Sequence, residues 1–284
     1  MIVSRLANSR AWYGFRSNPL SIVGLVLVSL LVLAAILAPF ITPYPQHAAS
    51  FVDFAHASQP PSADYWFGTD LIGRDILTRL VFAYRVSLSI AISVLAVSAP
   101  IGITVGLLAG YFGGYAEAVL MRVTDVFLSI PPLVLALAIL GLLPPNLINA
   151  VIALIIMWWP WYARLTYSLT RQLRREGYVI AAEVVGASNR NILFRQILPN
   201  CIPSLLTKMT LDIGIIILVT AALGFLGLGA QAPTPELGSM IAEGSKNLPD
   251  LWWMAVFPGL AILLAVMGFN LLGDGLKDIW EVSA

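Results

Sequence analysis

Cysteine and histidine are nearly absent from this sequence of 284 residues, which contains Cys201, His47 and His56 as its only members of these types. A disulfide needs two cysteines, and structural metal sites are usually built from several cysteine or histidine ligands. The sequence therefore excludes an intrachain disulfide and a CxxC site, and a histidine metal centre is not expected. We predict that no metal is bound and that Cys201 is a small buried apolar side chain.

Charged residues are also scarce, at 11% of the chain, whereas hydrophobic residues make up 59% and the mean hydropathy is +0.87. A water-soluble domain of this length does not need so many apolar residues to fill a core. Sixteen basic and fifteen acidic residues leave no basic domain, so no nucleic-acid partner is expected. The composition predicts an all-α integral membrane protein surrounded by membrane lipid.

Long apolar runs occur at six places. A membrane-spanning helix needs about 20 mainly apolar residues. The runs cover residues 20–41, 86–110, 119–143, 147–167, 205–228 and 253–272. The first run is longer than the apolar core of a signal peptide and no convincing cleavage site follows it, so we interpret residues 20–42 as a retained first helix. We predict about six transmembrane helices.

The basic residues predict the orientation, because basic residues near the ends of spans are retained on the cytoplasmic side. Seven of the sixteen fall between the fourth and fifth runs or at their edges: Arg164, Arg171, Arg174, Arg175, Arg190, Arg195 and Lys208. Placing this connection in the cytoplasm makes both termini cytoplasmic, with residues 1–19 and 277–284 as the two ends. Residues 43–85 then form a periplasmic loop.

Proline interrupts four of the predicted spans, at Pro100, at Pro131 with Pro132, at Pro160 and at Pro258. Proline removes a backbone donor and clashes with the preceding helical turn, so these helices should bend or unwind locally. Kinked helices suit a moving pathway, but proline is also common in ordinary membrane helices. Both interpretations stay open.

The cytoplasmic connection contains a second signal, a short amphipathic helical pattern over residues 178–188 with Gly186 suited to a C-terminal cap. A helix outside the bilayer with an apolar face needs a protein or the membrane surface to cover it. Ala181-Ala182, Gly186 and Leu198-Pro199 resemble the EAA loop of binding-protein-dependent ABC importer permeases. The usual glutamate of that family falls at Ile180 here, and Gln196 occupies its usual isoleucine position.

A second resemblance lies in the predicted periplasmic loop. Residues 67–75, with Gly68, Thr69, Asp70, Gly73, Arg74 and Asp75, are similar to the GTDxxGRD signature of the oligopeptide, dipeptide and nickel permeases, in particular their C-type subunit. The resemblance covers residues 12–280, or nearly the whole chain. A charged turn held by local hydrogen bonds is an equally simple interpretation of the signature's role.

The resemblance implies a type I ABC importer permease-like fold. Its five-helix core would cover residues 86–276 and include a cytoplasmic coupling loop at 168–204. The residues implied in ATPase coupling are Ala181, Ala182, Glu183, Gly186, Ala187, Leu198 and Pro199. Whether Glu183 substitutes for the glutamate missing at Ile180 stays open.

The same resemblance implies a transport subunit of the bacterial inner membrane that moves peptides, with dipeptides or oligopeptides favoured. Its implied partners are a second homologous permease subunit in a heterodimer, two ABC ATPase subunits and a periplasmic solute-binding protein. The sequence contains no GxxxxGK[ST] phosphate loop. We therefore expect no cofactor in this chain and no enzymatic activity, with ATP-Mg used by the partner subunits.

Two acidic residues stand out because ionisable groups inside a membrane are costly. Asp212 and Asp125 are candidates for a pathway, although ion pairs with Lys208 and Arg122 are equally plausible. Five tryptophans are expected to be interfacial anchors rather than a substrate-stacking box: Trp158, Trp159, Trp161, Trp252 and Trp253.

Two other function classes compete with the importer. A secondary transporter or channel should show charges in mid-span and an inverted repeat, and neither is clear in this sequence. A membrane-embedded enzyme should show paired carboxylates, an HExxH motif or a serine near a base, and none lies in or beside a span.

Overall fold

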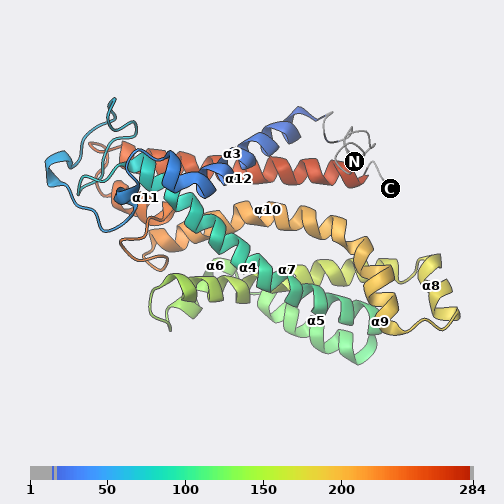
Figure 1. Cartoon of the computed structure of the whole chain (residues 1–284). Helices are drawn as coiled ribbons and strands as arrows, with labels where there is room; N and C mark the ends of the chain where they lie inside the picture. Colours follow the sequence, from blue (N-terminus) through green and yellow to red (C-terminus); the bar gives the residue numbers. More distant parts are fainter. Residues whose placement is uncertain (1–14, 16–17, 282–284) are drawn as a thin grey trace.

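The computed structural model describes residue 15 and residues 18–281, and within these residues the regular structure is helical (Figure 1). An isolated bridge between Thr69 and Asp75 is the exception. The elements are α3 (Pro19–Ile41), η1 (Pro45–Ala48), η2 (Phe54–His56), α4 (Ile76–Phe112), α5 (Gly114–Leu128), α6 (Pro132–Leu140), α7 (Leu147–Leu173), α8 (Gly177–Val184), α9 (Asn189–Asn191), the π-helical turn η3 (Ile192–Ile197), α10 (Leu198–Phe225), α11 (Leu237–Ser245) and α12 (Trp253–Glu281). The predicted all-α fold is confirmed.

The predicted number of spans is confirmed when one broken span is counted. Five helical stretches are long and apolar enough to cross a membrane: α3, α4, α7, the continuous stretch Asn189–Phe225, and α12. The sixth consists of α5 and α6, which are bent by 84° at the break between them. Pro131 and Pro132 lie at this break, and together they remove two consecutive backbone donors. At Pro100, Pro160 and Pro258 the helices continue through the proline.

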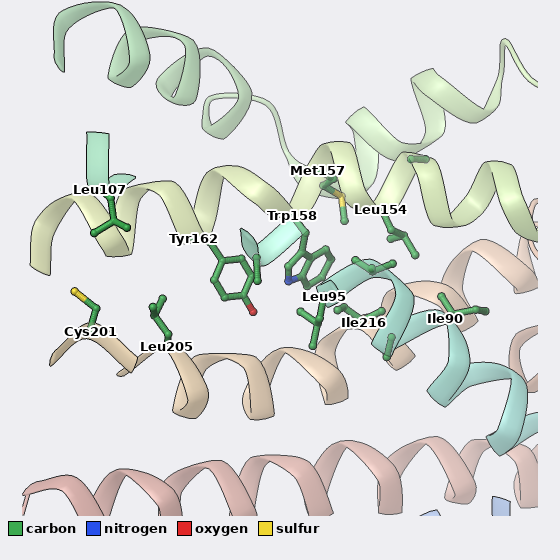
Figure 2. Packing of buried hydrophobic residues seen from close by; sticks show 14 of the residues in the cluster. Ile90, Leu95, Leu107, Leu154, Met157, Trp158, Tyr162, Cys201, Leu205 and Ile216 are labelled. Atoms are coloured by element: carbon green, nitrogen blue, oxygen red, sulfur yellow. The ribbon is translucent and has the colours of Figure 1, made fainter. Parts of the chain in front are cut away.

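The close packing of α4 against α7 depends on small residues spaced four apart on α4. A Cβ atom added to Gly102 would lie 2.3 Å from the Trp159 carbonyl oxygen, and one added to Gly106 would lie 2.5 Å from that of Ala163. Glycine therefore permits the backbones to approach, as in other membrane helix pairs. A core of buried residues from α4, α6, α7 and α10 forms around this contact (Figure 2).

A second core joins α3, α4, α10, α11 and α12. The start of α3 meets the end of α12, where the Asn18 side-chain amide donates to Asp278 at 2.9 Å. In Figure 1 these two helix ends lie at the same end of the bundle as α8, and α11 lies at the opposite end. An even number of spans between α3 and α12 accounts for this arrangement.

Several helices are longer than the apolar runs that predict them. α4 begins at Ile76, ten residues before the expected start of the second span, because the Asp75 side chain caps its first turn by accepting from the Thr78 N–H at 2.8 Å. α7 continues to Leu173, and the next long helix already begins at Asn189. Of the expected coupling loop, only residues 174–188 lie between these two long helices.

Candidate functional site

The α8 turn, defined here as residues 174–188, projects from one end of the bundle (Figure 1). Its short helix stops because Gly186 adopts a left-handed conformation with φ +83°. The Gly186 N–H donates to the Glu183 carbonyl and the Ala187 N–H to that of Ala182, both at 3.0 Å. This is the Schellman pattern, in which glycine carries no Cβ penalty, and the glycine cap predicted from the sequence is present.

One face of α8 is buried and the other is open. Val179 is fully buried in the core, and Ala182 and Ala187 pack against that core. Val184 and Val185 are 81% and 86% exposed. Two valines with so little cover at a projecting turn form an apolar surface of the kind that a partner protein covers.

The α8 turn is tied to the end of α4. Arg174 donates from Nη1 to the Tyr111 carbonyl oxygen at 2.5 Å, its guanidinium lies over the Tyr111 ring, and its Nε is 4.0 Å from a Glu183 carboxylate oxygen. The Tyr111 hydroxyl in turn donates to Asn189 at 3.1 Å. These contacts couple the orientation of α8 to the helices of the bundle. Glu183 therefore points to an arginine of its own turn.

The structure brings Leu198-Pro199, the last part of the sequence that resembles the EAA loop, close to α8. Leu198 is half-buried against the core and Pro199 is exposed in the first turn of α10. Next to them, the Asn200 amide donates to the Tyr178 hydroxyl at 3.2 Å. Ala181, like Val184 and Val185, is exposed. The two parts of the motif thus lie on neighbouring segments.

At the opposite end of the bundle, residues 69–75 form a turn that is held by hydrogen bonds among its own residues and is buried except at Leu71 and Ile72. It is called here the Asp70 turn. Thr69, Asp70, Arg74 and Asp75 are all buried. One Asp70 oxygen accepts from the Ile72 and Arg74 N–H groups at 3.1 and 2.9 Å, and the other pairs with the Arg74 Nε at 2.7 Å. These contacts are those of a charged turn held by local hydrogen bonds.

The Asp70 turn also joins distant parts of the chain. The Trp253 indole donates to the Thr69 carbonyl oxygen at 3.2 Å, and the Asp75 N–H donates to the His47 Nδ1 at 2.9 Å. Gly73 has φ +83°, and a Cβ there would lie 1.9 Å from the Asp53 carbonyl oxygen. The turn therefore fixes the loop after α3 against the start of α4 and against α12.

Burial changes the pKa values of ionisable groups around the Asp70 turn. Desolvation raises the pKa of Asp75 and lowers that of His47. A second arginine, Arg79, is buried and lies 3.6 Å from Asp70. Two arginines thus share one aspartate, with Glu243 as a further acidic neighbour.

The expectation that the five tryptophans are interfacial anchors is wrong for Trp253 and Trp158. Trp253 is 5% exposed and bonds to the Asp70 turn, and Trp158 is buried in the first core (Figure 2). Trp161 and Trp252 are exposed. The contact of Trp253 with Thr69 carries no sequence signal, because 184 positions separate the two residues.

The Asp212 carboxylate has two hydrogen-bond partners. It is 1% exposed, accepts from the Lys208 ammonium at 2.8 Å and from the Tyr162 hydroxyl at 2.6 Å. Figure 2 shows the Tyr162 ring directed from α7 toward α10. The pair with Lys208 considered from the sequence is therefore present within α10, and the hydrogen bond from Tyr162 joins α10 to α7.

Asp125 pairs with Arg164 of α7, and not with Arg122 of its own helix. Both partners are about half exposed, so this contact is a surface pair at the α5–α7 contact. Among the residues that the structure describes, no group of three His, Cys, Asp or Glu side chains could hold a metal. Cys201 is buried, as expected.

Two family profiles match the chain. "Binding-protein-dependent transport system inner membrane component" matches residues 102–281, and "N-terminal TM domain of oligopeptide transport permease C" matches residues 8–61.

Curated relatives match over almost the whole chain. A dipeptide transport system permease protein of Alkalihalophilus pseudofirmus is 41% identical over 94% of this chain and 87% of its own length. A probable D,D-dipeptide transport system permease protein of Escherichia coli K12 is 39% identical over 99% and 93%. A glutathione transport system permease protein of Pectobacterium atrosepticum is 38% identical over 94% and 88%.

Solved structures share the fold at lower sequence identity. One inward-facing form of the MetNI methionine ABC transporter has a chain that is 17% identical, with a TM-score of 0.58, covering 74% of this chain and 98% of that chain. A second crystal form gives 19% identity and a TM-score of 0.53, covering 72% and 97%.

Proposed function

Because the chain belongs to the family of binding-protein-dependent transport system inner membrane components, we propose that it is the permease subunit of an ATP-driven importer for small peptides. The chain is a multi-pass protein of the inner membrane. The peptide class is supported by the names of the relatives, which transport dipeptides or glutathione.

The observation that carries the proposal is the α8 turn, with two nearly uncovered valines at its tip. We place it in the cytoplasm, because it begins with Arg174 and Arg175, and Arg171 lines the same cavity as these two residues. An ATPase subunit that covers Val184 and Val185 would move α8, and the contacts of Arg174 with Tyr111 would pass that movement to the end of α4.

The proposed complex has two ATPase subunits, which use ATP-Mg, a second homologous permease subunit and a periplasmic solute-binding protein. This chain supplies the route and no covalent chemistry, as alternating access requires. The coupling role is assigned to Ala181, Ala182, Glu183, Gly186, Ala187, Leu198 and Pro199, together with Val184 and Val185. The Asp70 turn is assigned to holding the outer end of α4 in place, through the contacts of Gly68, Thr69, Asp70, Gly73, Arg74 and Asp75.

The test is a gentle purification of the tagged chain from its native membrane, with mass spectrometry of the proteins that accompany it. Uptake of a labelled dipeptide is measured in the same cells. We expect ATPase subunits and a second permease subunit to purify together with the unaltered chain. A Val184→Asp, Val185→Asp double variant should insert normally but lose the ATPase subunits and dipeptide uptake.

Val52→Asp is the matched control, because Val52 is also an exposed valine but lies at the opposite end of the bundle. This variant should retain the ATPase subunits. The proposal fails if the unaltered chain purifies alone under conditions that preserve related complexes, which favours a secondary transporter. It also fails if the double variant keeps both its ATPase subunits and its uptake.

A further inference from the structure

A cavity of about 360 Å³ lies between the α8 turn and the ends of the neighbouring spans. Its charged lining is formed by Arg171 near the end of α7, by Arg174 and Arg175 at the start of the α8 turn, and by Glu117 in the first turn of α5. Ile180 of α8 closes one side. The end of α4 and the start of α5 complete the lining through Gly110 and Gly113.

The cavity carries more positive charge than its own acidic group can neutralise. Three guanidinium groups face one carboxylate, that of Glu117, and this carboxylate already accepts from Arg171 at 3.0 Å and from the Tyr167 hydroxyl. Arg174 is held by Tyr111 and lies 4.0 Å from a carboxylate oxygen of Glu183, outside the cavity lining. The Arg175 guanidinium has no hydrogen bond or ion pair with any residue that the structure describes, and only the Arg175 backbone N–H is paired, with the Gln172 carbonyl.

The position of the cavity indicates which class of anion can bind there. It lies at the ends of two membrane-spanning helices, α4 and α7. Next to it, Tyr115 is 86% exposed and Phe112 is half exposed. Exposed aromatic residues beside span ends are typical of the level of lipid headgroups.

We infer that this cavity binds the phosphate group of an anionic phospholipid. Arginine recognises phosphate through paired, charge-assisted hydrogen bonds, and basic pockets between spans on the cytoplasmic side take anionic headgroups. Arg175 supplies the free guanidinium, and Arg171 and Arg174 supply further charge. Ile180 gives the acyl chains of the lipid an apolar wall, where a glutamate would repel the phosphate.

The experiment is native mass spectrometry of the full-length chain with phosphatidylglycerol or phosphatidylcholine added to the detergent micelles. We expect the unaltered chain to retain phosphatidylglycerol in preference to phosphatidylcholine. Arg175→Gln should weaken that retention about fivefold, since one basic residue near a membrane surface contributes about that factor. Ile180→Glu should weaken it at least as much, because it adds a negative charge to the wall.

Arg190→Gln is the control, because Arg190 is an exposed arginine that lines a separate cavity and not this one. It should leave retention of phosphatidylglycerol unchanged. An equal loss of phosphatidylglycerol retention in Arg190→Gln and Arg175→Gln would overturn the inference. Retention that is unchanged in both Arg175→Gln and Ile180→Glu would also overturn it. If inorganic phosphate at millimolar concentration displaces the lipid completely, the site takes a soluble anion and the lipid assignment fails.

Discussion

The Trp253 indole nitrogen lies 3.2 Å from the Thr69 carbonyl oxygen and donates a hydrogen bond to it. Thr69 precedes Asp70 in the buried turn, and Trp253 is the first residue of α12. The contact therefore joins the loop after the first span to the start of the last one. A Cβ on the adjacent Gly68 would lie 2.8 Å from the same indole, so the ring fills the space beside that glycine.

Removing the indole should loosen this end of the bundle. Trp253→Phe keeps an aromatic ring but leaves the Thr69 carbonyl unpaired, so we expect a loss of about 1 kcal/mol in stability. Trp253→Ala also removes the buried ring and should cost about 3–5 kcal/mol. The measurement is the fraction of monodisperse protein left after heating in detergent. Trp252→Phe, at an exposed neighbouring tryptophan, should behave like the unaltered chain, and a larger effect there would contradict this role of Trp253.

The features that could be predicted from the sequence are those fixed by nearby residues. Apolar length predicts the spans, and Gly186 predicts the end of α8 because only local backbone conformation decides it. The contact of Trp253 with Thr69 depends on how the first and last spans pack, so no local pattern contains it. Arg164 illustrates the same limit, because Asp125 pairs across helices with it while Arg122 is nearer in sequence.

Lys208 and Asp212 should respond unequally to substitution. Lys208→Met leaves the Asp212 carboxylate buried without its cation, and we expect a loss of about 3–5 kcal/mol. Asp212→Asn leaves Lys208, which is partly exposed and can turn toward water, and the amide oxygen still accepts from Tyr162. That variant should lose about 1–2 kcal/mol. Thermal unfolding of the purified chain measures both.

The double variant Lys208→Met, Asp212→Asn separates charge from packing. No ion is buried in it, so it should be at least about 2 kcal/mol more stable than Lys208→Met alone. Additive losses in the double variant would show that the two charges do not interact in the folded protein.

Gly186 should tolerate asparagine and reject valine. Its φ of +83° is a conformation that asparagine adopts far more readily than a β-branched residue, and nothing lies within 4 Å of a Cβ placed there. Strain, and not a clash, therefore decides the outcome. Dipeptide uptake should be largely kept in Gly186→Asn and abolished in Gly186→Val, with equal membrane insertion measured by immunoblot. Equal uptake in the two variants would mean that the α8 cap does not matter for transport.

We expect Glu236 to make the stability of the chain depend on pH. It lies between the last two spans, just before α11, and is buried against Gly224 and Gly229. One of its carboxylate oxygens accepts from the Ala230 N–H at 2.9 Å, and the other has no hydrogen bond to any described residue. Burial raises its pKa from 4.5 to about 7, against the smaller opposing effect of the Ala230 N–H.

The direction of the pH effect follows from proton binding. Between pH 4.5 and 7 the folded chain keeps the proton on Glu236 while the unfolded chain releases it, so stability falls as pH rises through this window and levels off above it. The full span corresponds to about 3 kcal/mol. Glu236→Gln mimics the protonated acid in the same space and should remove this slope. Unfolding midpoints of the two proteins should therefore diverge from pH 5 to pH 8, with Glu236→Gln the more stable at pH 8. Parallel curves would show that Glu236 stays ionised in the folded protein, and its unpaired oxygen would then need a cation or donor that moves toward it.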